Sequence, residues 1–191
     1  MGLLLARTDP GAAQGVPAQN LAVEIEATID APPLEVRATL LDLDRYGEWF
    51  PNTVQWKVLE RQPGSLLAYG RLSLPWPVDD RDYVVRYQWS EDQRVPFRLR
   101  AVATPAGGPP VSENVVRVEQ MTTTWEVAPL GSGTFIRYLY EGSPGGLLPD
   151  WVFEIGWEMQ TGVLMEALER QIERRREAKK GGAAGASRPR D

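Results

Sequence analysis

The chain has 191 residues, of which 42% are hydrophobic and 25% are charged, and its formal net charge is -5. This length suits one domain, and the acidic balance argues against binding to nucleic acid. The sequence contains no Cys and no His, which excludes disulfides, zinc–sulfur sites and catalytic devices of the Ser-His-Asp or Cys-His type. A metal site would need oxygen ligands alone, so we expect no metal, no cofactor and no catalytic residue.

No apolar run approaches the ~20 residues that span a bilayer, and Leu3–Leu5 is too short for the core of a signal peptide. We therefore expect a cytoplasmic protein, and a monomer. Residues 1–20 are rich in Gly, Ala, Pro and Gln and predict a flexible leader, whereas residues 181–191 predict a disordered tail. Residues 21–180 contain no linker and no repeat, so we expect them to form a single domain.

Regular elements are predicted along the whole of this domain. Residues 21–29 alternate apolar and polar side chains, which predicts a half-buried strand. Two prolines then open a helix that runs to about Leu43, and residues 44–51 predict a short second helix stopped by a proline. Six strands follow, with turn residues between them, at 54–61, 66–74, 83–90, 97–104, 115–127 and 134–141. The last element is a long helix over residues 148–180.

The long helix is amphipathic over its first half. Its apolar stripe consists of Val152, Ile155, Met159, Val163 and Ala167, while residues 169–180 are charged all round. Because short connections favour antiparallel neighbours, we expect an α+β fold in which this helix covers a curved antiparallel sheet of about seven strands. A crevice between such a sheet and its helix is a typical place for a ligand.

Alternation predicts which strand residues face this crevice. One face of the strand 66–74 consists of Leu66, Ala68, Gly70, Leu72 and Leu74. In the strand 115–127, Trp125 and Val127 mark the buried face, which also carries Arg117, Glu119, Met121 and Thr123. Arg117 and Glu119 would then form a charge pair at one end of the crevice. The alternative is that the strand leaves the cover of the helix before Arg117, which leaves the pair solvated.

The segment from Pro75 to Val85 carries an arginine at the start of a strand. The prolines on either side of Trp76 have no backbone N–H to donate to a neighbouring strand, so the preceding strand should stop here. If Arg81 points inward, it needs a carboxylate such as Asp82 or an anionic ligand, because its guanidinium stays charged. The alternative is a surface turn in which Arg81 and Asp82 form a solvated pair.

Three separated segments resemble StAR-related lipid-transfer (START) domains. They are the Pro-aromatic-Pro…Arg-Asp-aromatic-Val pattern at 75–85, the strand that begins with residues 115–120, and the Pro-Gly-Gly…Pro-Asp-Trp pattern within 143–151. The upstream residues 31–49 are similar to a pattern shared across the helix-grip superfamily, which includes polyketide cyclases and Bet v 1-like allergens. The resemblance covers about residues 22–176 and implies a helix-grip fold with a lipid or sterol cavity between the sheet and the last helix.

The resemblance also implies roles for single residues. Arg81 matches the motif arginine, which in phospholipid-binding members faces the cavity near the head group. Thr123 and Leu74 match cavity-lining positions, and Arg117 and Glu119 match positions whose inward role varies within the family. With the crevice-facing pattern, this gives as candidate ligand-binding residues Leu72, Leu74, Arg81, Tyr83, Arg117, Met121, Thr123, Trp125, Ile155 and Met159.

The main functional hypothesis is a non-enzymatic domain that binds a lipid or another hydrophobic small molecule in an internal cavity. It extends to transfer of that molecule between membranes through transient contact with their surfaces, with Trp151 and Trp157 as candidates for a lid or membrane-facing rim. One alternative is a polyketide cyclase or aromatase, although the missing His and the lack of an evident acid–base pair weigh against it. Another alternative is a chaperone for a small molecule such as a quinone.

Overall fold

The computed structural model describes residues 21–76, 78–90, 92, 94–146 and 150–186, and within the last helix it describes side chains only for 162–180. The strands are β1 (Leu21–Ile29), β2 (Thr53–Gln62), β3 (Ser65–Leu72), β4 (Asp80–Trp89), β5 (Phe97–Ala103), β6 (Val115–Arg117), β7 (Met121–Leu130) and β8 (Gly133–Gly142). The helices are α1 (Pro33–Leu40), the 3-10 turn η1 (Leu43–Arg45), α2 (Tyr46–Trp49) and α3 (Asp150–Ala186). No helix in these ranges is long and apolar enough to cross a membrane.

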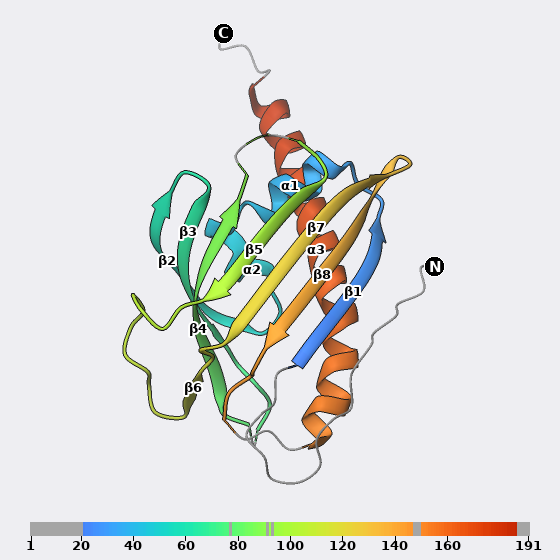
Figure 1. Cartoon of the computed structure of the whole chain (residues 1–191). Helices are drawn as coiled ribbons and strands as arrows, with labels where there is room; N and C mark the ends of the chain where they lie inside the picture. Colours follow the sequence, from blue (N-terminus) through green and yellow to red (C-terminus); the bar gives the residue numbers. More distant parts are fainter. Residues whose placement is uncertain (1–20, 77, 91, 93, 147–149, 187–191) are drawn as a thin grey trace.

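The strands form one eight-stranded sheet. Seven of them lie in the order β1-β8-β7-β5-β4-β3-β2 with all neighbours antiparallel, and β6 pairs with β4 outside this order. Figure 1 shows α3 running across one face of this sheet, with α1 and α2 beside it. We call the face toward the helices the inner face. The predicted α+β fold, an antiparallel sheet covered by a long C-terminal helix, is confirmed.

The ends of the chain differ from the predicted boundaries in one respect. Helix α3 continues to Ala186, past its predicted end near Lys180 and into the predicted tail. The predicted leader, residues 1–20, and residues 187–191 lie outside the described residues.

The predicted strand 115–127 is two strands, and this break changes where its charged residues lie. Strand β6 pairs with β4 in parallel, and the chain then bends before β7 pairs with β5. Within the bend, Val118 is buried and its backbone N–H donates to the carbonyl of Asp82 at 2.8 Å. The predicted inward pair of Arg117 and Glu119 is therefore wrong, because side chains alternate only along an uninterrupted strand. Glu119 is exposed, and Arg117 pairs with Asp82.

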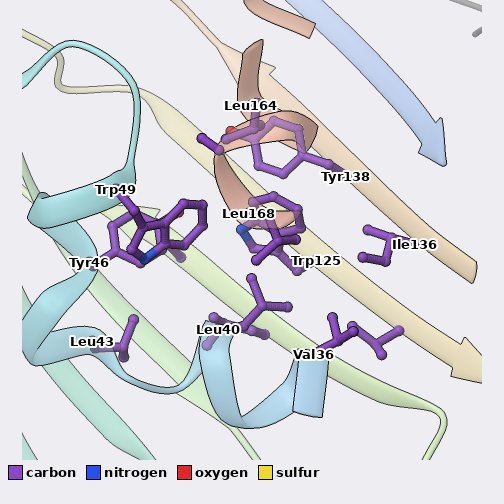
Figure 2. Close-up of a cluster of buried hydrophobic side chains, with 14 of the residues drawn as sticks. Val36, Leu40, Leu43, Tyr46, Trp49, Trp125, Ile136, Tyr138, Leu164 and Leu168 are labelled. Carbon is purple, nitrogen blue, oxygen red and sulfur yellow. The ribbon is translucent and has the colours of Figure 1, made fainter. Parts of the chain in front are cut away.

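A core of large side chains fills the space between part of the inner face and the helices. Figure 2 shows Trp125, Ile136 and Tyr138 of the sheet directed toward residues of α1, α2 and α3, among them Leu40 and Leu168. Alternation predicted that Trp125 and Val127 are buried, and this prediction is confirmed.

The buried stripe of α3 is rotated relative to the predicted one. Leu164, Leu168 and Ile172, spaced four residues apart, are buried, whereas Val163 is 42% exposed. Ala167 is buried as predicted. Val152, Ile155 and Met159, the rest of the predicted stripe, have side chains outside the described residues.

The sequence predicted that the end of α3 is charged all round. This prediction is wrong, because Gln171 and Ile172 are buried against the domain. Its arginines also have partners on the first half of the chain. Arg176 donates to Glu35 of α1 at 2.7 Å, and Arg175 forms an ion pair with Asp42. Apolar packing and ion pairs together therefore fix this half of the helix to α1 and the turn that follows it.

Candidate ligand site on the inner face of the sheet

The register of the sheet brings six of the candidate residues onto the inner face. Leu72 of β3 lies opposite Arg81 of β4, and Tyr83 points to the same side as Arg81 because it lies two residues further along the strand. Met121, Thr123 and Trp125 alternate in the same way along β7. Tyr83 and Trp125 belong to the buried core, and Leu72 and Met121 pack against it.

Side-chain volume is distributed unevenly over this face. Near the end of β4 that contains Trp89, it carries Phe97, Leu99 and Trp125. Toward the other end, four inward positions carry small residues beside the larger Leu72, Tyr83 and Met121. The small residues are Ala68, Gly70, Ala101 and Ala103. A Cβ atom on Gly70 would lie 2.5 Å from the ring of Tyr83, so this ring lies directly across the glycine. The small residues thus let aromatic rings lie close to the sheet.

Tyrosines place further polar groups between the inner face and the helices. Burial raises the pKa of Tyr46, Tyr83, Tyr87 and Tyr138 well above the ordinary value, and that of Tyr140 to about 12. These phenols therefore stay neutral at physiological pH and offer hydroxyl groups without charge. Apart from Tyr83, the sequence analysis did not select them, although alternation within the predicted strands 83–90 and 134–141 would have placed Tyr87, Tyr138 and Tyr140.

Arg81 places a charge on this face, and it is only 4% exposed. Its Nε donates to the carbonyl of Pro144 at 3.0 Å, Nη2 to that of Gly145 at 3.1 Å, and Nη1 to that of Asp79 at 2.5 Å. Among the described residues, no carboxylate lies within ion-pair distance of it. Burial lowers the pKa of the Arg81 guanidinium, against the opposing effect of the carboxylates of Asp79 and Asp80.

The prediction that a carboxylate such as Asp82 pairs with Arg81 is therefore wrong, and so is the alternative of a solvated surface pair. The reason is geometric, because consecutive residues of a strand point to opposite faces. Arg81 faces inward, and Asp82 faces outward toward Arg117. The other predicted partner of Arg81, an anionic ligand, stays a prediction.

The three carbonyl bonds of Arg81 also fix the chain between β8 and α3. Two of the accepting carbonyls belong to Pro144 and Gly145, which follow the last strand. Gly145 and Gly146 have φ angles of 67° and 64°, in the left-handed region that glycine adopts without strain. Both glycines also lie against Val116 of β6. Arg81 thus joins the start of β4 to the segment that leads into the covering helix.

On the outer face, Arg117 forms a bidentate pair with Asp82. Its Nε lies 2.6 Å from Oδ1 and its Nη2 lies 2.8 Å from Oδ2, and Tyr69 donates its hydroxyl to Oδ2 at 3.3 Å. Arg117 also donates to the carbonyl of Pro109 at 2.9 Å, which holds the β5–β6 connection against this face. The structure therefore does not bring Arg117 to the other candidate ligand residues.

The remaining candidates lie outside the sheet. Strand β3 ends at Leu72, so half-buried Leu74 belongs to the connection between β3 and β4, where its backbone N–H donates to Asp80 at 3.2 Å. The same connection contains Trp76, which is 90% exposed. Ile155 and Met159 belong to α3, and their side chains lie outside the described residues. No cluster of three or more potential metal ligands occurs in the described part of the chain.

An antiparallel sheet covered by a long C-terminal helix is the helix-grip fold. The model of the family described as polyketide cyclase / dehydrase and lipid transport matches residues 20–177, and the chain belongs to this family. The predicted resemblance to START domains is confirmed.

The chain is also similar in sequence to individual proteins. The phosphatidylcholine transfer protein of Mus musculus is 28% identical over 127 residues, which make up 64% of this chain and 58% of that protein. The chain spans less than two thirds of the length of the curated relatives it matches.

Solved structures share the fold, and two of them serve as examples. A STAR-related lipid transfer protein fragment from Xanthomonas axonopodis has a TM-score of 0.71 and 21% identity, over 88% of this chain and 98% of that one. The Zhui aromatase/cyclase from Streptomyces sp. R1128 has a TM-score of 0.62 and 19% identity, over 82% of this chain and 96% of that one.

Proposed function

We propose that the protein binds a hydrophobic, lipid-like molecule between the inner face of its sheet and helix α3. The observation that carries this proposal is a buried guanidinium on an apolar and aromatic face, where Arg81 has backbone carbonyls as partners and shares the face with Leu72 and Tyr83. Membership of a family described by lipid transport supports the same function. So does the sequence likeness to a phosphatidylcholine transfer protein.

The ligand is proposed to lie over the part of the inner face where side chains are small. Leu72, Leu74, Tyr83, Met121 and Thr123 would line this space, with Trp125 at its boundary with the solid core. Ile155 and Met159 would face it from α3. Each buried methylene contributes about 0.8 kcal/mol, so one acyl chain supplies on the order of 10 kcal/mol without any specific contact. Selectivity must then come from the few polar groups, which are Arg81, Thr123 and the tyrosine hydroxyls.

We propose a binding role rather than catalysis. The buried phenols are poor acids and bases near neutral pH because burial raises their pKa values. The same phenols favour a second candidate function, in which neutral hydroxyls hydrogen-bond the carbonyl oxygens of a polyketide or a quinone. Such a ligand carries no phosphate and would not need Arg81.

Native mass spectrometry of the purified protein tests the proposal directly. We expect a retained lipid in the wild type, and we expect the double variant Leu72→Trp, Leu74→Trp to lose it, because two indoles would occupy the proposed space. Leu130→Trp is the matched control, since Leu130 is half exposed at the far end of β7. Thermal unfolding would verify that each variant is folded. Unchanged lipid content in a folded double variant would contradict the proposed site, and a bound quinone or polyketide would favour the second function.

We further propose that the exposed connection between β3 and β4 contacts the membrane during transfer of the ligand. Trp76 is 90% exposed there, and an indole prefers the boundary between lipid and water. Trp76→Ser should slow transfer of a fluorescent lipid between donor and acceptor vesicles by about tenfold. Burying a large apolar side chain contributes roughly 1.5–3 kcal/mol, and the variant would lose part of this free energy when the protein docks on a vesicle. Equilibrium binding of the lipid should not change.

Val54→Ser provides the control, because Val54 is an exposed apolar residue on β2. If Trp76→Ser and Val54→Ser transfer lipid at the same rate, the β3–β4 connection does not dock on the vesicle.

A further inference from the structure

A groove of about 540 Å³ lies at the β4–β5 hairpin. Its lining includes Gln88, Arg98 and Arg100 from the strands and Asp92 and Arg94 from the turn. Phe97, Leu99 and Ala101 of β5 point into the core, so Arg98 and Arg100, which alternate with them, point to the outer face. The lining also includes the core residue Phe97, so the groove opens at the edge between the two faces. It lies at the end of β4 that contains Trp89, whereas Arg81 and the ligand proposed beside it lie at the start of this strand.

The groove is rich in positively charged residues, although the protein as a whole is negatively charged. Among the described residues, three arginines and one aspartate line it, whereas the chain as a whole has a formal net charge of -5. Arg94 lies 3.3 Å from Asp92, and Arg98 lies 2.5 Å from Glu126 of β7. Within the described ranges, Arg100 has no carboxylate within ion-pair distance. The groove thus carries an excess of positive charge centred on Arg100.

The neighbours of Arg100 in the sheet are polar but neutral. Gln88 lies opposite Arg100 on β4, and Thr124 lies opposite it on β7. A carboxylate at either position would neutralise the guanidinium, as Glu126 does for Arg98 two positions along the strand. Instead, an amide and a hydroxyl flank it, and both can donate hydrogen bonds to an anion.

We propose that this groove binds a phosphate group, with Arg100 as the residue that contacts it. The planar guanidinium donates two parallel hydrogen bonds to phosphate oxygens, and such charge-assisted bonds are stronger than neutral ones. Arg98 and Arg100 lie two residues apart on one face, about 7 Å along the strand, so both can face one dianion. Arg94 closes the groove from the turn. The phosphate belongs either to a soluble phosphate monoester or to the head group of a lipid at a membrane surface.

The test compares Arg100→Gln with Arg174→Gln, which removes the same charge from an exposed position on α3. Titration calorimetry with inorganic phosphate and with glycerol 3-phosphate covers the soluble source. Co-sedimentation with phosphatidylcholine vesicles that contain phosphatidylglycerol covers the lipid source. We expect Arg100→Gln to weaken binding by about tenfold in one of the two assays, while Arg174→Gln binds like the wild type.

A second variant tests whether the groove itself, and not only the net charge of the protein, determines binding. Thr124→Val keeps every charge and removes the hydroxyl beside Arg100, so we expect it to weaken the same interaction by a smaller factor. A loss of binding by Arg100→Gln in the calorimeter assigns the groove to a soluble phosphate, and a loss seen with vesicles alone assigns it to a head group. The proposal is overturned if neither probe binds, or if Arg100→Gln and Arg174→Gln reduce binding equally.

Discussion

Replacing Asp82 with Asn should destabilise the domain by about 3–5 kcal/mol, the cost of leaving one partner of a buried ion pair without the other. The side chain of Asp82 is 1% exposed and that of Arg117 is 11% exposed. The variant would leave the Arg117 guanidinium beside a neutral amide in a place where water cannot replace the lost charge. Urea denaturation followed by tryptophan fluorescence would measure the free energy of unfolding.

An exposed arginine–aspartate pair on the same protein gives the control. Arg61 donates through Nη2 to both carboxylate oxygens of Asp44, at 2.8 and 2.7 Å, but these side chains are 51% and 66% exposed. Because water screens this pair, Asp44→Asn should cost less than about 1 kcal/mol. Equal losses in Asp44→Asn and Asp82→Asn would contradict the role of burial.

The double variant Asp82→Leu, Arg117→Met completes this experiment. It removes both charges and keeps apolar volume, so it should recover a large part of the stability lost in Asp82→Asn. Arg117 also holds the β5–β6 connection through the carbonyl of Pro109. Any loss that remains in the double variant measures this attachment together with the bond from Tyr69.

The sequence predicted those parts of the structure that depend on local pattern. The alternation in β1 and β3 and along Met121–Val127 gave the inner face of each strand, because a side-chain period of two follows from strand geometry alone. The helix-grip order followed from the series of elements and the short connections between them. Alternation does not predict which face carries Arg81, because residues 81–85 of β4 are all buried.

The parts that depend on pairing between distant segments could not be predicted. The bend at residues 118–120 arises because β6 pairs with β4 while β7 pairs with β5, and no residue in the bend is a proline or a glycine. Arg117 meets Asp82 across 35 positions of sequence. The carbonyls that accept from Arg81 belong to backbone, which carries no signal in the sequence. The rotation of the buried stripe on α3 likewise depends on which helix face meets the sheet.

The second large effect is expected at Arg81. If the guanidinium meets the phosphate of a lipid on the inner face, Arg81→Met should weaken binding of an anionic phospholipid at least tenfold, since truncating one partner of a buried charge pair costs roughly 2–5 kcal/mol. Binding of a neutral sterol should change much less, because methionine keeps most of the apolar stem. Competition between the two lipids for wild type and variant would measure this change in preference.

Arg81 also holds Pro144 and Gly145 through hydrogen bonds, so its structural role must be separated from ligand recognition. Release of the segment before α3 would weaken binding of every ligand and lower the stability of the domain, whereas loss of a head-group contact would weaken binding of the anionic lipid alone. Arg81→Lys sharpens the distinction, since lysine keeps the charge but not the planar fork that reaches several carbonyls at once. It should restore part of the preference for the anionic lipid without restoring the lost stability. An unchanged preference in both variants would assign Arg81 to holding the helix segment and leave selectivity to the neutral hydroxyls of Thr123 and the buried tyrosines.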